Sequence, residues 1–140
     1  MSRTHALLVL FAVAVAACER RGPNAAESRA HAALALRNVL AYPQSSVISV
    51  SSGNEAAEMM LSSPAPVDAI VQWYREFLPL NKWTIKTNSR DRAGTVSIYA
   101  ERDTRPLWIT LRPNLGDGGT TYRLVGVFNI DSTRMDSIKK

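Results

Sequence analysis

The feature that most constrains the fold of this chain is an apolar–polar alternation that recurs four times between residues 83 and 130. Alternation with a period of two is typical of a strand with one buried face, because successive side chains point to opposite sides. Turn-forming sequences separate the four segments, so the pattern predicts antiparallel strands joined by hairpins. The four apolar sets are Trp83 and Ile85; Val96, Ile98 and Ala100; Leu107, Ile109 and Leu111; and Tyr122, Leu124, Gly126, Phe128 and Ile130.

The three connecting turns predict which residues pair, because loop length sets the register of a hairpin. A tight turn at 103–105, a turn at 89–94 and a loop at 113–120 each place the apolar residues on a single face. This agreement predicts a four-stranded antiparallel meander. The expected pairs are Trp83 with Ala100, Ile85 with Ile98, Ile98 with Ile109, Val96 with Leu111, Ile109 with Leu124, and Leu111 with Tyr122.

A helix is expected over residues 66–78, because its apolar residues recur at helical spacing along one stripe. These residues are Val67, Ile70, Val71, Tyr74, Phe77 and Leu78. Pro66 suits the first helical turn and Pro79 should end the helix. We expect this helix to cover the apolar face of the meander.

Residues 47–50 and 57–62, on either side of the turn sequence Ser52-Gly53-Asn54, predict an additional hairpin, although residues 55–60 also suit a short helix. The predicted fold class is therefore α+β: an antiparallel sheet, made of an N-terminal hairpin and a four-stranded meander, with one amphipathic helix on one face and an Ala-rich helix preceding it.

The first 18 residues resemble a bacterial lipoprotein signal. The apolar run from Ala6 to Ala17 has 12 residues, which as a helix span about 18 Å and fall short of a bilayer core of roughly 30 Å. Val15-Ala16-Ala17-Cys18 resembles a lipobox, which implies cleavage before Cys18 and lipidation of its thiol. Two or more acyl chains would anchor the chain stably. The alternative is an ordinary secretory signal that happens to end in Cys. Glu19, in place of Asp, favours the outer membrane, facing the periplasm.

These features divide the chain into five segments. They are a signal peptide (1–17), a lipidated tether (18–28), an Ala-rich helix (29–41), an α+β domain (42–132) and a C-terminal tail (133–140). Tyr42-Pro43 should end the Ala-rich helix, because proline disfavours helical geometry in the residue before it.

Residues 42–130 contain a set of recurring packing motifs. Tyr42-Pro43 precedes a hairpin, the following helix carries Val67, Trp73, Tyr74 and Leu78, and Trp83 begins the next strand. In these features the segment resembles a small α+β domain of bacterial envelope lipoproteins of uncharacterised type. These are packing residues, so the resemblance implies a fold and assigns no catalytic residue.

The opposite face of the predicted meander is the candidate binding site. The register pairs Tyr99 with Trp108 in a cross-strand row and places Lys86, Arg112 and Arg123 around it. An aromatic row rimmed by cations can bind an envelope protein, a glycan or an acidic lipid headgroup. Two structural alternatives remain open: the aromatic pair stabilises the sheet alone, or the Ala-rich helix covers it.

Reactive side chains are scarce. Cys18 is the single cysteine, and His31 is the single histidine that remains after loss of the signal carrying His5. We therefore expect no metal site, no cofactor and no catalytic residues. The net charge of +5 does not predict nucleic-acid binding, because an exported protein does not meet nucleic acid.

The expected function is that of a membrane-anchored, periplasm-facing, non-enzymatic binding or accessory module of the cell envelope. Two alternatives remain: a hydrolase or lyase of envelope polymers that uses unidentified carboxylates, and a purely structural lipoprotein. A smooth sheet face with an exposed Trp108 favours binding. A cleft lined by two carboxylates with strongly shifted pKa values favours an enzyme.

Overall fold

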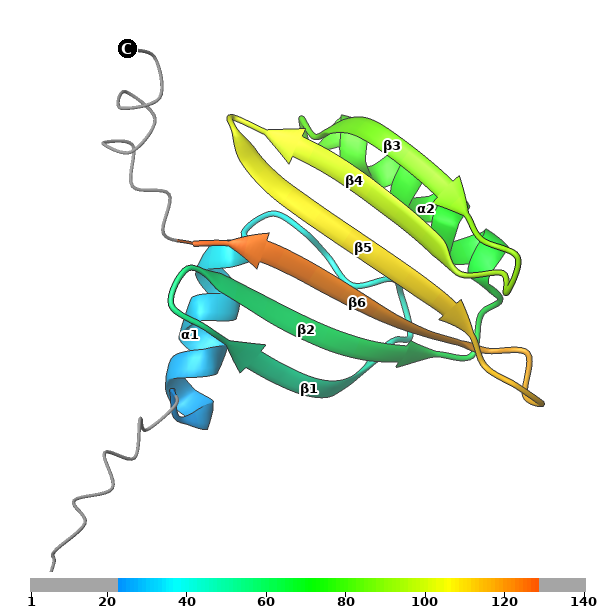
Figure 1. Ribbon diagram of the computed structural model, residues 1–140, viewed down its shortest axis with the longest axis horizontal. Coiled ribbons are helices and arrows are strands. Elements are labelled where there is room, and N and C mark those ends of the chain that lie inside the picture. The colour runs from blue at the N-terminus through cyan, green and yellow to red at the C-terminus, as the bar shows by residue number, and fades with distance from the viewer. Residues whose placement is uncertain (1–22, 129–140) are drawn as a thin grey trace, which may run out of the picture.

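The computed structural model describes residues 23–128, and its ribbon is drawn in Figure 1. The six strands form one antiparallel sheet in the order β1-β2-β6-β5-β4-β3. The predicted α+β class is confirmed, and the hairpin and the meander join through the pairing of β2 with β6. The elements are α1 (Ala25–Ala35), β1 (Ser46–Ser52), β2 (Ala56–Ser63), α2 (Val67–Leu80), β3 (Thr84–Arg90), β4 (Val96–Arg102), β5 (Arg105–Pro113) and β6 (Thr120–Val127).

Several parts of the sequence-based prediction fall outside the described residues. They are the signal peptide at 1–17, the lipidation site Cys18 with tether residues 19–22, Ile130 of the last predicted strand, and the tail at 133–140. Within residues 23–128, no helix has the length and apolar character needed to cross a membrane.

Two of the three predicted registers are confirmed. Ile98 pairs with Ile109 across β4 and β5, and Ile109 pairs with Leu124 across β5 and β6. The turn between β4 and β5 consists of Asp103 and Thr104, which both have positive φ, at 49° and 63°. This backbone matches the right-handed twist of the two strands and fixes their register. The apolar residues of these three strands are accordingly buried on one face.

The register of β3 was predicted wrongly. Ile85 pairs with Ala100 rather than Ile98, and Trp83 lies before the strand. Two causes are visible. The Asp91 carboxylate accepts hydrogen bonds from the backbone N–H groups of Ala93 and Thr95, which closes the turn after Arg90. A bulge between Ile85 and Thr87 then adds one residue to β3. Because a bulge reverses the alternation beyond it, Asn88 and Arg90 lie opposite buried Ile98 and Val96.

The predicted helix at 29–41 is α1, and both of its ends differ from the prediction. A capping box starts α1 early, because the Asn24 side chain accepts from the Glu27 N–H and the Glu27 carboxylate accepts from the Asn24 N–H. The helix ends at Ala35, seven positions before Tyr42, and Asn38 follows with a φ of 65°. Residues 25–28, which we predicted to be tether, are therefore helical.

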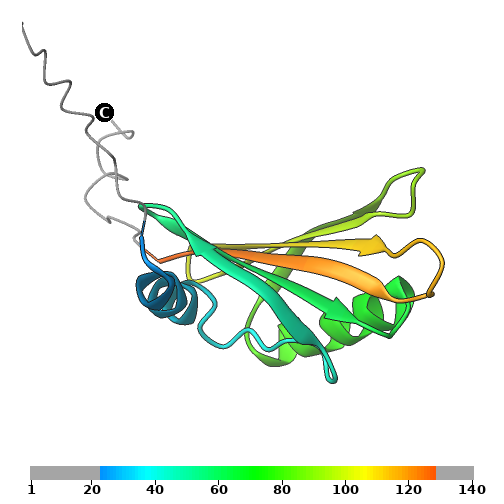
Figure 2. The same cartoon turned by 90° about the horizontal axis from the view of Figure 1, so that it is seen from below.

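Both helices lie on the same side of the sheet, as Figure 2 shows. α1 packs on β1, β2 and β6 through buried Ala32, Ala35 and Leu36. The approach to β6 is so close that a Cβ on Gly126 would lie 2.5 Å from the carbonyl oxygen of Ala35. Small residues on both elements therefore allow α1 to contact the sheet backbone directly. The possibility that this helix covers the Tyr99/Trp108 face is excluded.

α2 occupies nearly the range predicted for it, Val67–Leu80 against 66–78, and includes Pro79 in its last turn. Its buried Tyr74 donates a hydrogen bond to the Leu40 carbonyl, 3.0 Å away. The Tyr122 hydroxyl accepts from the Tyr42 N–H at 3.0 Å and donates to the Ser45 hydroxyl at 2.7 Å. These two tyrosines attach the segment between α1 and β1 to the core. The hairpin at 46–63 is confirmed as two strands, so the alternative short helix at 55–60 is excluded.

Candidate functional site

The sheet surface opposite the two helices carries the residues predicted to bind a partner; we call it the open face. Within the described part of the chain no helix lies on it (Figure 2). Trp108 on β5 is 42% exposed there, while its strand neighbours Leu107 and Ile109 are fully buried on the other side. The exposed tryptophan on an uncovered sheet face, which favours binding, is therefore present.

Tyr99 and Trp108 form the predicted cross-strand pair. Their ring centroids are 5.5 Å apart and the rings are inclined by 31°. Trp108 pairs in turn with Val125 on β6, so the row continues across three strands as predicted. Aromatic pairs of this geometry stabilise a sheet by themselves, and they also form a flat apolar platform that a ligand can contact.

Lys86 lies at one end of this platform, in the bulge of β3. Its Nζ is 3.7 Å from a Glu101 carboxylate oxygen, and the other oxygen of that carboxylate accepts a 2.5 Å hydrogen bond from the Tyr99 hydroxyl. This hydrogen bond raises the pKa of the Tyr99 phenol, with smaller contributions from partial desolvation and from the charge of Glu101. Lys86 is therefore paired with Glu101, just as Arg123 is paired with Glu58 at 3.6 Å.

Arg112 and Arg123 lie together on the open face at the other end of the row. They line a hollow of about 310 Å³ whose other lining residues are Met60, Thr110, Thr121 and Tyr122. Thr110 pairs directly with Arg123, and Arg112 pairs directly with Thr121, so the two arginines are diagonal neighbours. The structure thus confirms that Tyr99, Trp108, Arg112 and Arg123 share one surface, and it places the hydroxyls of Thr110 and Thr121 beside the two arginines.

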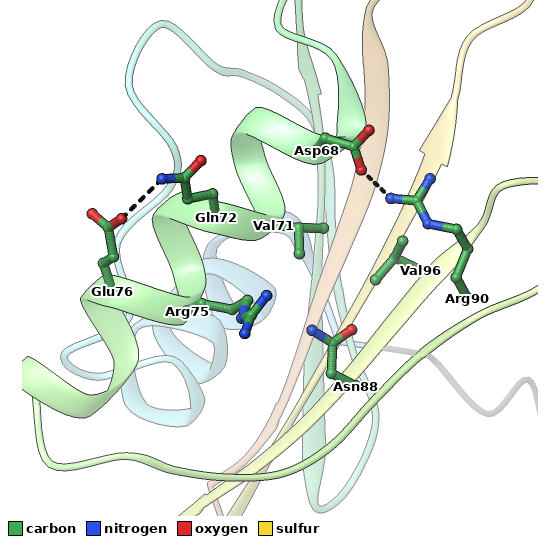
Figure 3. A pocket seen from close by; sticks show the side chains of 8 residues that line it. All are labelled: Asp68, Val71, Gln72, Arg75, Glu76, Asn88, Arg90 and Val96. Atoms are coloured by element: carbon green, nitrogen blue, oxygen red, sulfur yellow. Dashed lines mark hydrogen bonds and ion pairs between the residues drawn. The ribbon is translucent and has the colours of Figure 1, made fainter.

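A larger cleft of about 680 Å³, which the sequence did not indicate, opens between α2 and β3 (Figure 3). It exists because the β3 bulge turns Asn88 and Arg90 toward α2. Apolar side chains at these two positions would instead pack against the helix and fill the space. Its two carboxylates are engaged: Asp68 pairs with Arg90, and Glu76 accepts a 3.2 Å hydrogen bond from Gln72. Figure 3 shows both interactions on the rim of the cleft.

His31 is placed next to two serines, a contact that the sequence could not reveal because 21 residues separate His31 from Ser52. Its Nδ1 lies 3.0 Å from the Ser52 hydroxyl, which donates to the Ser28 hydroxyl at 3.4 Å. The ring stacks on Phe128 at 4.2 Å between centroids. These contacts join α1 to β1 and to the end of β6. Among residues 23–128, no cluster of three His, Cys, Asp or Glu side chains could hold a metal ion.

Comparison with known proteins gives one positive result. A family model described as START domain-like matches residues 44–121, which is more than half of the chain and extends from just before β1 into β6. Among curated proteins and among solved structures, nothing matches significantly. A START-like domain indicates a ligand-binding module, which is compatible with the binding role expected from the sequence. On this match, the chain belongs to the START domain-like family.

Proposed function

We propose that this protein is a lipid-anchored, non-enzymatic binding module of the bacterial envelope that engages its partner through the open face. The observation that carries the proposal is the position of Trp108, which is 42% exposed on a sheet face that no described helix covers. Membership of a family typical of ligand-binding modules supports a binding role. The partner is an envelope protein or glycan facing the periplasm.

The proposal of a lipid anchor is based on the sequence alone. Val15-Ala16-Ala17-Cys18 follows an apolar run of signal-peptide length. After cleavage, five residues would separate Cys18 from Asn24, which caps α1. A short connection of this kind would hold the domain close to the membrane surface, and Glu19 favours the outer membrane.

Photo-crosslinking in intact cells tests the binding face. A photoreactive amino acid at Trp108 should capture the partner, which mass spectrometry then identifies. The matched control carries the same amino acid at Gln72, an exposed position on α2 on the other side of the sheet. Equal capture at the two positions, or none at Trp108, would contradict the proposal.

Metabolic labelling with palmitate tests the anchor independently of the binding face. Label should be incorporated into the wild-type chain and lost in Cys18→Ala. A Ser2→Ala variant, which changes the signal segment without removing the thiol, should keep the label. Persistence of the label in Cys18→Ala would rule out lipidation at this residue.

A further inference from the structure

We infer that the hollow between Arg112 and Arg123 binds the acidic group of a glycan whose sugar rings stack on Trp108. The inference rests on the proposed function, because it names a partner chemistry for the open face. It starts from the composition of the hollow, where two guanidinium groups and two threonines meet on neighbouring strands.

The cations of this hollow are available to a ligand. Arg112 has no hydrogen-bond or ion-pair partner within residues 23–128, and it is exposed. Arg123 is paired with Glu58 through one guanidinium nitrogen at 3.6 Å, and the other N–H groups of its guanidinium are left for a ligand. Two guanidinium forks on adjacent strands match the planar geometry of a carboxylate, which accepts paired N–H donors.

The neutral residues of the hollow suit the same ligand. The Thr110 hydroxyl, on β5 between the strand positions of Trp108 and Arg112, has no partner in the described residues. The Thr121 hydroxyl donates to Asn114 at 2.8 Å and keeps lone pairs that can accept. Polar hydroxyls beside the cations favour a ligand that carries hydroxyl groups as well as charge.

The aromatic platform and the hollow lie on the same strand, within reach of one oligosaccharide. Trp108, Thr110 and Arg112 alternate on β5 and therefore share the open face. With a rise of about 3.3 Å per residue, Trp108 and Arg112 are about 13 Å apart along the strand. A glycan that stacks one sugar ring on the indole can thus reach the arginines with an acidic group further along its chain.

The part of the open face formed by β4, β5 and β6 is too polar to enter a membrane. On β4, β5 and β6, Trp108 is the single large apolar side chain that is exposed. A face that binds a bilayer needs a continuous apolar surface, whereas one aromatic ring flanked by arginines and hydroxyls is suited to a charged, hydroxylated polymer. Glu101 places a negative charge at the Tyr99 end of the open face. We therefore expect the acidic group of the ligand at the hollow, where Arg112 has no ion-pair partner among the described residues.

Isothermal titration calorimetry of the full-length protein in detergent provides the test. The probe is oligogalacturonate, and the matched control is the same oligosaccharide with its carboxylates methyl-esterified. The acid form should bind and the ester should bind at least about tenfold more weakly, because charged hydrogen bonds to the carboxylate are lost. Binding of the acid should also weaken as salt is raised.

Substitutions on the two sides of the sheet test whether the oligosaccharide binds to the open face. Arg112→Gln and Arg123→Gln should each reduce affinity for the acid about tenfold, while Trp108→Ala should weaken acid and ester alike. Arg75→Gln, which removes an exposed arginine from α2 on the other side of the sheet, should leave binding unchanged.

Three results would overturn the inference: equal affinity for acid and ester, unchanged binding in both arginine variants, or binding of anionic phospholipid vesicles in place of the oligosaccharide. Crosslinking at Trp108 separates this inference from the proposed function. If Trp108 captured an envelope protein but the oligosaccharide did not bind, the glycan inference would be refuted and the open face would still be a binding site. If Trp108 captured nothing and the oligosaccharide did not bind, both the inference and the proposed function would be refuted.

Discussion

The two faces of the same sheet are built from alternate residues of the same strands, yet they have opposite properties. On β5, Leu107, Ile109 and Leu111 are fully buried under the helices, while Trp108 between them is 42% exposed. One face holds the fold together and the other is free to bind. Because the side-chain period of a strand is two, adjacent residues can serve these separate purposes. Substitutions at neighbouring positions should therefore differ sharply in their effects.

The largest expected difference is between Ile109 and its neighbour Thr110. Ile109→Ala should lower the free energy of unfolding by about 2–5 kcal/mol, because it leaves a cavity in the core. Thr110→Ala on the open face should change it by about 0.5 kcal/mol or less. Urea denaturation followed by circular dichroism measures both. Similar losses for the two variants would mean that the faces are not energetically distinct.

The contact of α1 with the sheet gives the next largest effect. Gly126→Ala should destabilise the protein by about 1–3 kcal/mol, because the new methyl group meets the backbone carbonyl of Ala35 at 2.5 Å. Gly53→Ala is the control, since its Cβ would make only an ordinary contact at 4.0 Å with the Ala56 carbonyl oxygen. If Gly126→Ala were as stable as wild type, α1 would not be docked as closely as described.

The covered face should also lose stability at alkaline pH through Tyr74. Burial, and secondarily Tyr122, raise the pKa of the Tyr74 phenol above its ordinary value of 10.0. The folded state then retains a proton that the unfolded chain releases, so this stabilisation is complete below pH 10 and declines as the pH rises further. In Tyr74→Phe, stability at neutral pH should fall by about 1 kcal/mol through the lost hydrogen bond to Leu40.

The same variant should weaken the decline in stability above pH 10, which urea denaturation at a series of pH values would reveal. Leu78→Met, which alters the same core without removing an ionisable group, should retain the wild-type alkaline decline. An unchanged decline in Tyr74→Phe would assign alkaline unfolding to other groups.

At Trp108 we expect a small effect on stability together with a large effect on binding. Trp108→Ala should cost about 1 kcal/mol or less, the value of a cross-strand pair with Tyr99, and the variant should still unfold cooperatively. Thermal denaturation measures the stability, and loss of oligogalacturonate binding in the same preparation measures the function. A loss of several kcal/mol would instead make Trp108 a structural residue.

Much of the fold could be predicted from local patterns. The tight turn at Asp103 and Thr104 and the loop before β6 fixed two registers, and with them the position of Tyr99 beside Trp108. Most of the candidate binding face followed from those registers. The β3 register failed because a bulge depends on how the strand meets its neighbours, and nothing in the alternation of residues 83–89 marks the extra residue.

The tertiary structure decided which parts of this pattern meet in space. Alternation determined that one face of the sheet would be apolar, because the period of a strand fixes where side chains point. It did not determine that α1, a helix of mostly alanine with little apolar surface, would join α2 on that face. The packing of α1 on this face depends on Gly126, because its missing side chain lets the backbone of β6 approach the backbone of Ala35, 91 positions earlier in the sequence. The open face is therefore a consequence of long-range packing, and the residues it exposes were already specified by the sequence.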